Sequence, residues 1–194
     1  MARCQADEGN ASLPTPSIAT DRLILTPLTA ADAQALFAYR SLPEVCRYQS
    51  WEPTRQEDAI SFIKGSGSAA FDTPGTWFQL GIRLRESHDL VGDLGVHFLH
   101  DGEQVEIGFT VAPAFQGRGL GTEAVRGLID YLFTVLGKHR VIASADPRND
   151  ASLRLLKRVG MRQEAHFLES VRFRGAWADD AVFAVLASEW NAHR

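Results

Sequence analysis

The sequence predicts one α/β domain built on a mixed β-sheet, and three observations support this fold class. Predicted strands and helices follow the order ββ-helix-β-helix-ββ. The length of 194 residues suits one well-packed domain and is too short for two ordinary ones. The content of 45% hydrophobic and 23% charged residues is typical of a soluble globular protein. We therefore assign residues 1–18 to a flexible leader and residues 19–194 to the domain.

Charge and cysteine content narrow the classes of function. The net charge of −4 gives no global attraction to nucleic acid or to an anionic membrane, so neither is expected as a partner. Cys4 and Cys46 form no CxxC pair and have no metal-ligand spacing, so we expect no disulfide framework, no metal and a reducing compartment. Residues 1–20 lack the apolar stretch of a signal peptide, and no apolar run reaches membrane-spanning length. We therefore expect a cytoplasmic protein.

The first third of the chain predicts one strand and two helices. The leader is polar, contains two prolines and shows no periodicity. Residues 22–26 form a short apolar strand, and apolar residues at helical spacing follow over residues 30–39. Residues 47–54 form a loop with aromatic side chains, and a second helix is expected over residues 56–64.

The middle of the chain predicts strands, because its apolar period falls to two. Apolar and polar side chains alternate over residues 77–82 and again over residues 93–98. The pair Asp101-Gly102 is a strong signal for a hairpin turn into a third strand over residues 105–111.

A long amphipathic helix follows over residues 120–136 and is expected to end at Gly137. Residues 141–145 form a short strand. Asn149 is suited to cap a fourth helix, which ends at Gly160. The rest of the chain alternates again, which predicts closing strands.

The sharpest local feature is a glycine-rich loop, Gln116-Gly117-Arg118-Gly119-Leu120-Gly121, between the third strand and the long helix. Glycine lets a ligand approach main-chain N–H groups, and the helix start adds partial positive charge, so the segment can cradle a pyrophosphate. A Walker loop requires Gly-Lys-Ser/Thr, whereas Gly121 is followed by Thr122-Glu123. A dinucleotide fingerprint requires GxGxxG, whereas this loop reads GxGxG and lies past mid-chain. A glycine-rich loop that holds no ligand is the remaining alternative.

The string QGRGLGTEA matches the Q/R-x-x-G-x-G/A signature of the GNAT superfamily of N-acetyltransferases, and the chain resembles that superfamily. The strings EIGFTVAPAFQGRGLGTEA and NDASLRLLKRVGMR resemble its RimJ/RimL-like branch, which includes acetyltransferases of ribosomal-protein N-termini. The resemblance runs from RLILTPL to DDAVFAVLASEW. It implies a mixed, mostly antiparallel central sheet flanked by about four helices.

The resemblance also implies acetyl-CoA as co-substrate and no metal. In the family the glycine loop holds the pyrophosphate, the preceding strand pairs its backbone with the pantetheine arm, and an asparagine at the fourth helix binds that arm. The corresponding cofactor-binding residues are Phe109, Thr110, Val111, Gln116, Gly117, Arg118, Gly119, Leu120, Gly121, Thr122 and Asn149. Arg154, Lys157 and Arg158 are suited to attract the adenosine 3′-phosphate, although a solvated helix face is the more common explanation.

Acetyl transfer requires a neutral amine, a polarised thioester carbonyl and a proton for the leaving thiolate. Glu106 is the first choice for a base acting through water, because the missing side chain of Gly108 leaves room on its strand face; a structural ion pair is the alternative. The resemblance offers Glu169 as a rival, although the spacing does not align cleanly and a surface role is the alternative. It also implies that the Ser152 hydroxyl protonates the thiolate, whereas serine is common in a first helical turn for other reasons.

Three aromatic residues, Tyr48, Trp51 and Trp77, are candidates for lining the acceptor pocket, although core packing explains Trp77 equally well. The expected function is direct transfer of acetyl from acetyl-CoA to a primary amine, such as the N-terminal α-amine of a ribosomal protein. Two alternatives stay open: acetylation of a small-molecule amine or antibiotic, and a non-catalytic sensor that binds coenzyme A. A homodimer is also left open, because many relatives in the family form dimers.

Overall fold

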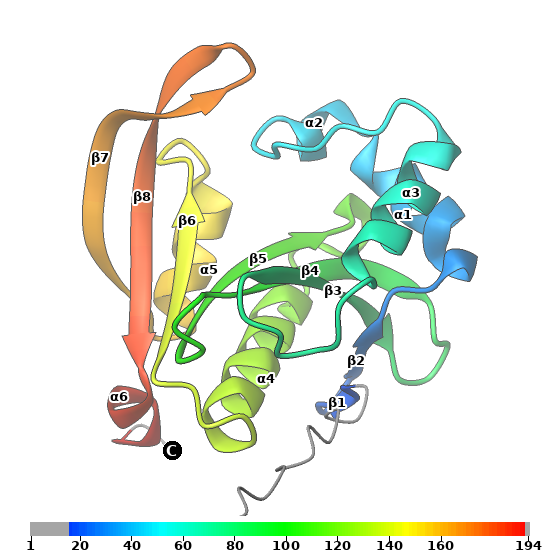
Figure 1. Ribbon diagram of the computed structural model, residues 1–194. Helices are drawn as coiled ribbons and strands as arrows, with labels where there is room; N and C mark the ends of the chain where they lie inside the picture. The colour runs from blue at the N-terminus through cyan, green and yellow to red at the C-terminus, as the bar shows by residue number, and fades with distance from the viewer. Residues whose placement is uncertain (1–15, 193–194) are drawn as a thin grey trace, which may run out of the picture.

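The computed structural model describes residues 16–192 and confirms the predicted α/β fold (Figure 1). The strands are β1 (Ile18–Ala19), β2 (Leu23–Pro27), β3 (Thr76–Leu84), β4 (Leu90–Phe98), β5 (Gln104–Val111), β6 (Arg140–Ala145), β7 (Arg162–Phe173) and β8 (Ala176–Leu186). The helices are α1 (Ala33–Arg40), α2 (Pro43–Cys46), α3 (Gln56–Ser66), α4 (Leu120–Thr134), α5 (Asp150–Arg158) and α6 (Ala187–Ala192), with 3₁₀ turns at Ala30–Asp32 and Pro113–Phe115. Most of the predicted leader, residues 1–15, lies outside the described residues, and its last residue, Ile18, is buried in β1.

The sheet is mixed and mostly antiparallel, as predicted. Its strand order is β1-β2-β3-β4-β5-β6-β8-β7, and every pairing is antiparallel except that of β5 with β6. The four expected helices correspond to α1, α3, α4 and α5, and the structure adds the short helices α2 and α6.

The parallel pairing of β5 with β6 is short, and this creates an opening in the sheet. The two strands pair only over residues 104–106 and 140–142. Beyond Glu106, β5 stays paired with β4 up to Val111, whereas β6 stays paired with β8 up to Ala145. Figure 1 shows the two halves of the sheet diverging from this point. We call the gap between the C-terminal ends of β5 and β6 the strand opening.

The main core lies between α4 and one face of the sheet. Leu128, Ile129 and Leu132 of α4 are 0% exposed, as are Leu94 and Val96 of β4. The apolar stripe of α4 therefore fits the alternate apolar residues of the strands, which is the packing expected of an amphipathic helix on a sheet. This packing fixes the start of α4 beside the end of β5.

The opposite face of β4 carries a buried charge that anchors α1. The Asp93 carboxylate is 0% exposed and accepts hydrogen bonds from the Tyr39 hydroxyl at 2.7 Å and from Arg40 Nε at 3.0 Å. Arg40 Nη1 in turn donates to Gln49 Oε1 at 2.9 Å. Burial raises the pKa of Tyr39 well above its usual value, so the phenol stays a hydrogen-bond donor. The network thereby fixes the loop over residues 47–54 relative to the sheet.

Candidate active site

A pocket with a volume of ≈ 590 Å³ lies at the strand opening, bounded by the end of β5, the glycine loop and the first turn of α5. The predicted coenzyme-binding residues all line it except Arg118. Ser152 and Tyr48 line it as well. Of the basic residues suggested for the 3′-phosphate, Arg154 and Arg158 line the pocket and Lys157 does not. The other predicted site residues outside this lining are Glu106, Glu169, Trp51 and Trp77.

The three glycines of the loop serve two different purposes. Gly117 and Gly119 have φ values of 74° and 77°, in the left-handed region that favours glycine. Gly121 has another constraint, because an added Cβ would lie 3.0 Å from Leu155 Cδ1 and 3.1 Å from Val111 Cγ2. The first two glycines shape the loop, and the third lets α4 approach β5 and α5. An added Cβ at Gly117 would meet no atom within 4 Å, so the loop surface there is open.

The end of β5 directs main-chain groups into the strand opening. The Ala112 N–H donates to Val91 O at 2.9 Å, toward β4. Because antiparallel pairing alternates along a strand, the main-chain groups of Phe109 and Val111 point the other way, toward β6. The Val111 carbonyl accepts a hydrogen bond from Gln116 Nε2 at 2.8 Å. The Gln116 side chain therefore ties the loop to β5, and the main chain of Phe109 faces the opening without a strand partner among the described residues.

Asn149 caps α5, as the sequence predicts. Its Oδ1 accepts the Ser152 N–H at 3.2 Å, and both residues line the pocket. Because the cap uses the amide oxygen, the amide nitrogen keeps its two donors for another partner. The Ser152 hydroxyl lies in the same first turn.

Two contacts cross over the strand opening and narrow it. The Tyr48 hydroxyl donates to the Arg148 carbonyl at 3.2 Å, which joins the loop after α2 to the loop before α5. Arg174, at the turn between β7 and β8, donates to the Cys46 carbonyl at 2.9 Å and pairs with Glu52 at 2.9 Å. Figure 1 shows this hairpin extending toward α2.

Glu106 lies at the last position of β5 that pairs with β6, where these two strands begin to separate. Trp77, His97 and Glu106 are aligned across β3, β4 and β5 on the face opposite the main core. The Trp77 and His97 rings stack with centroids 4.7 Å apart, and His97 Nδ1 lies 3.6 Å from Glu106 Oε2. An added Cβ at Gly108 would meet no atom within 4 Å, so space is present beside Glu106, as its sequence position suggests.

The structure does not bring the remaining predicted residues to the pocket. Glu169 lies on β7 at a bulge, with a φ of 45°, and its N–H donates to Asp179 Oδ1 at 2.9 Å. Trp51 stacks on Phe62 of α3 with ring centroids 4.2 Å apart, so it packs against the smaller apolar cluster formed mainly by α1 and α3. The Arg118 guanidinium lies over the Phe115 ring, 5.4 Å from its centroid, outside the pocket lining.

Comparison with known proteins gives the family. The model of the acetyltransferase (GNAT) domain matches residues 22–162. The chain belongs to the GNAT family. The uncharacterized N-acetyltransferase YnaD of Bacillus subtilis is 32% identical over 90% of this chain and 99% of its own length. The [ribosomal protein uS5]-alanine N-acetyltransferase of Escherichia coli is 26% identical over 94% of this chain and 97% of its own. An acetyltransferase structure from Bacillus anthracis superposes with a TM-score of 0.81 at 26% identity, covering 90% of this chain and 100% of that one.

The chain is thus a GNAT N-acetyltransferase.

One part of its pocket was not predicted from the sequence. Helix α2 contributes Glu44 and Val45 to the lining, and Gln49 follows from the next loop. The signal available was Pro43, because proline followed by an acidic residue is typical of a helix start.

Within residues 16–192 no group of three or more His, Cys, Asp or Glu side chains is placed to hold a metal ion. No helix in that range is long and apolar enough to cross a membrane.

Proposed function

We propose that this GNAT enzyme transfers acetyl from acetyl-CoA directly to a primary amine, and that the amine is the N-terminal α-amine of a protein. The observation that carries the proposal is the continuous pocket, which runs from the glycine loop along the end of β5 to the first turn of α5. The donors along its lining suit a pyrophosphate at the glycine loop and an extended thiol arm along β5.

The residues present fit the coenzyme. The loop N–H groups and the start of α4 provide donors and partial positive charge for the pyrophosphate. The main chain of Phe109 and the amide nitrogen of Asn149 flank the strand opening and suit the amide-rich pantetheine arm. Arg154 and Arg158 line the same pocket and provide positive charge for the 3′-phosphate.

The proposed reaction requires two proton transfers, one from the amine and one to the leaving thiolate. The amine nitrogen attacks the thioester carbonyl carbon, and the carbon–sulfur bond breaks. We place the proton from the amine on Glu106 through a water molecule, since space is present above Gly108. We assign Ser152 as the proton donor to the leaving thiolate. The serine regains a proton from solvent, and Glu106 releases the amine proton to solvent, so both groups return to their starting states. An α-amine has a pKa of about 7.7–8.0, against about 10.4 for lysine, so a weak base suffices for it.

Relatives support an α-amine acceptor. The Escherichia coli relative acts on the alanine of ribosomal protein uS5, by its name. On the face beside the opening, Trp77, His97 and Glu106 form a polar and aromatic surface where a peptide start can lie, and Tyr48 lies at the pocket.

The test is release of free thiol from acetyl-CoA in the presence of peptides beginning with alanine or serine. Matched control peptides have the same sequence with a blocked α-amine, and spermidine and free amino acids represent small amines. We expect turnover with free N-termini and none with blocked ones. If only the small amines are acetylated, the acceptor is a small molecule and the proposed protein α-amine is wrong. Binding of acetyl-CoA without thiol release for any amine would make the chain a sensor.

A further inference from the structure

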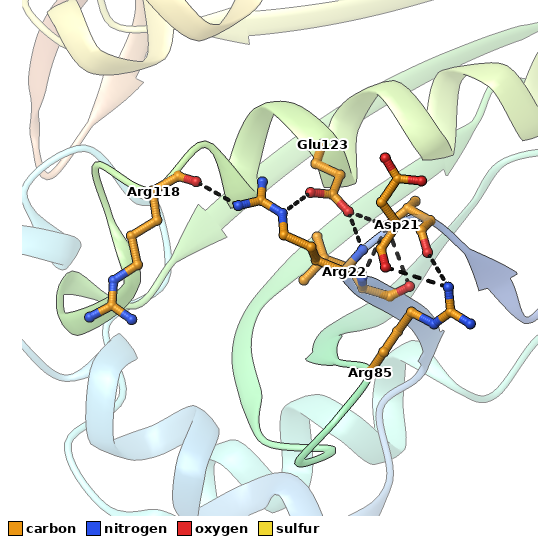
Figure 2. A network of polar contacts seen from close by, with 7 residues as sticks. Asp21, Arg22, Arg85, Arg118 and Glu123 are labelled. Atoms are coloured by element: carbon orange, nitrogen blue, oxygen red, sulfur yellow. Dashed lines mark hydrogen bonds and ion pairs between the residues drawn. The ribbon is translucent and has the colours of Figure 1, made fainter.

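A polar network outside the pocket ties the N-terminal strands to the glycine loop (Figure 2). Arg22, in the turn between β1 and β2, lies between Glu123 in the first turn of α4 and the carbonyl of Arg118 in the loop. Its Nε donates to Glu123 Oε2 at 2.6 Å, and its Nη1 donates to Arg118 O at 3.0 Å. One guanidinium therefore bridges the helix start and the loop.

Glu123 is fixed by several donors at once. Its Oε1 accepts the Thr20 hydroxyl at 2.6 Å and the Arg22 N–H at 2.7 Å, in addition to the Arg22 side chain on Oε2. Burial favours the neutral acid and would raise the pKa of Glu123, but these hydrogen bonds outweigh it, so that its pKa lies below the usual value. The carboxylate is thus ionised, and both of its oxygens accept hydrogen bonds. Its negative charge, close to the anion-binding end of α4, is compensated by Arg22.

The contact with the Arg118 carbonyl sets the direction of the next N–H group. In a trans peptide the C=O and the following N–H point in opposite directions. Since Arg22 holds the Arg118 oxygen on its own side, the Gly119 N–H is directed away from Arg22. Gly119 lines the coenzyme pocket, and its φ of 77° is one that only glycine adopts readily. An added Cβ there would lie 3.6 Å from Arg22 Nη2, so the guanidinium backs the loop directly.

We propose that Arg22 is a positioning residue for the coenzyme: with Glu123 it holds the Arg118–Gly119 peptide in the orientation that presents the Gly119 N–H to the pyrophosphate. This rests on the proposed use of acetyl-CoA. Arg22 contacts the loop but does not line the coenzyme pocket. Its removal should therefore weaken the binding of ligands that carry a pyrophosphate and spare ligands that lack one.

Arg22→Ala tests the proposal, with Arg85→Ala as matched control. Arg85 belongs to the same network but donates to the Thr20 and Asp21 carbonyls, at 2.9 Å and 3.4 Å, without a contact to the loop. Acetyl-CoA affinity is measured by calorimetry, and affinity for S-acetylpantetheine, which lacks the pyrophosphate and the adenosine, by NMR titration. We expect Arg22→Ala to weaken acetyl-CoA about tenfold, the loss expected for one charge-assisted hydrogen bond, with S-acetylpantetheine unchanged. Arg85→Ala binds both ligands like the wild type.

Three results would overturn the proposed positioning role of Arg22. These are an unchanged acetyl-CoA affinity in Arg22→Ala, an equal loss of affinity for both ligands in Arg22→Ala, and an equal loss of acetyl-CoA affinity in Arg85→Ala. The variant keeps the main-chain contact of residue 22 with Glu123, which favours folding. If its melting temperature nevertheless collapses, Arg22→Lys decides, because an ammonium can pair with Glu123 but lacks the planar fork that spans both partners. We expect Arg22→Lys to lose affinity for acetyl-CoA and to keep its affinity for S-acetylpantetheine. A wild-type affinity of Arg22→Lys for acetyl-CoA would refute the positioning role of Arg22. A wild-type protein that binds no acetyl-CoA would refute the proposed function instead.

Discussion

Glu106 and Glu169 illustrate how much surroundings decide the chemistry of one residue type. Glu106 lies where β5 and β6 separate, beside the open space over Gly108 and 3.6 Å from His97. Glu169 lies in a bulged segment of β7, where its N–H binds Asp179. Strand alternation was sufficient to place Glu106 and Gly108 on one face. The bulge could not be predicted, because it depends on the pairing of β7 with β8 rather than on local composition.

Replacing Glu106 with Gln tests the candidate base. With the acceptor that the thiol assay identifies, kcat at pH 7 falls by roughly 10²–10⁴, because Gln keeps the shape and removes the basicity. The loss shrinks as pH rises, since the amine then deprotonates unaided. Glu169→Gln is the control and keeps near-normal kcat. The assignment is wrong if Glu169→Gln loses activity while Glu106→Gln retains it across the pH profile.

At the scale of elements, periodicity found the long helices and the longer strands but missed β1, α2 and α6. All three are short, and α6 depends on a distant partner, since Glu189 pairs with Arg162 at the start of β7. The anchoring of α1 was also invisible in the sequence. Asp32 binds Arg83 of β3 through two hydrogen bonds of 2.7 Å each, and no local pattern connects positions 51 residues apart.

The Asp32–Arg83 pair predicts a pH-dependent contribution to stability. Burial alone would raise the pKa of Asp32, but the hydrogen bonds from Arg83 and Thr29 outweigh it, so that the folded-state pKa lies below the usual aspartate value of 3.8. The contribution is therefore fully present above pH 3.8 and is lost as pH falls through the lower folded-state value.

Urea unfolding checks this with Asp32→Asn. At pH 7 the free energy of unfolding falls by about 2–3 kcal/mol, because a partly buried guanidinium loses its ionised partner. The difference from the wild type narrows below pH 3.8. Glu57→Gln, which removes an exposed carboxylate from the first turn of α3, controls for the charge change and has a smaller effect. A difference that is constant from pH 7 to acid would contradict the ion-pair explanation.

At the scale of the molecule, the pocket results from how few residues join β5 to β6. The strands pair over residues 104–106 and 140–142 and then follow different neighbours, so the sheet opens at the ends that carry the glycine loop and Asn149 (Figure 1). The family resemblance predicted that the end of β5 and Asn149 belong to the coenzyme site. The residue spacing alone predicted only the glycine loop. The contacts that narrow the opening, Tyr48 with Arg148 and Arg174 with Glu52, join segments too distant in sequence for any motif to predict.

Binding of acetyl-CoA to Gly119→Val, measured by calorimetry, tests the central claim that the glycine loop holds the coenzyme pyrophosphate. Gly137→Val is a closely matched control, because Gly137 has a similar φ of 66° but follows the opposite end of α4, away from the pocket. Both variants strain a left-handed position and lose similar stability. The account predicts that only Gly119→Val weakens acetyl-CoA, by at least about tenfold. Unchanged affinity in a folded Gly119→Val protein, or an equal loss in Gly137→Val, would contradict it.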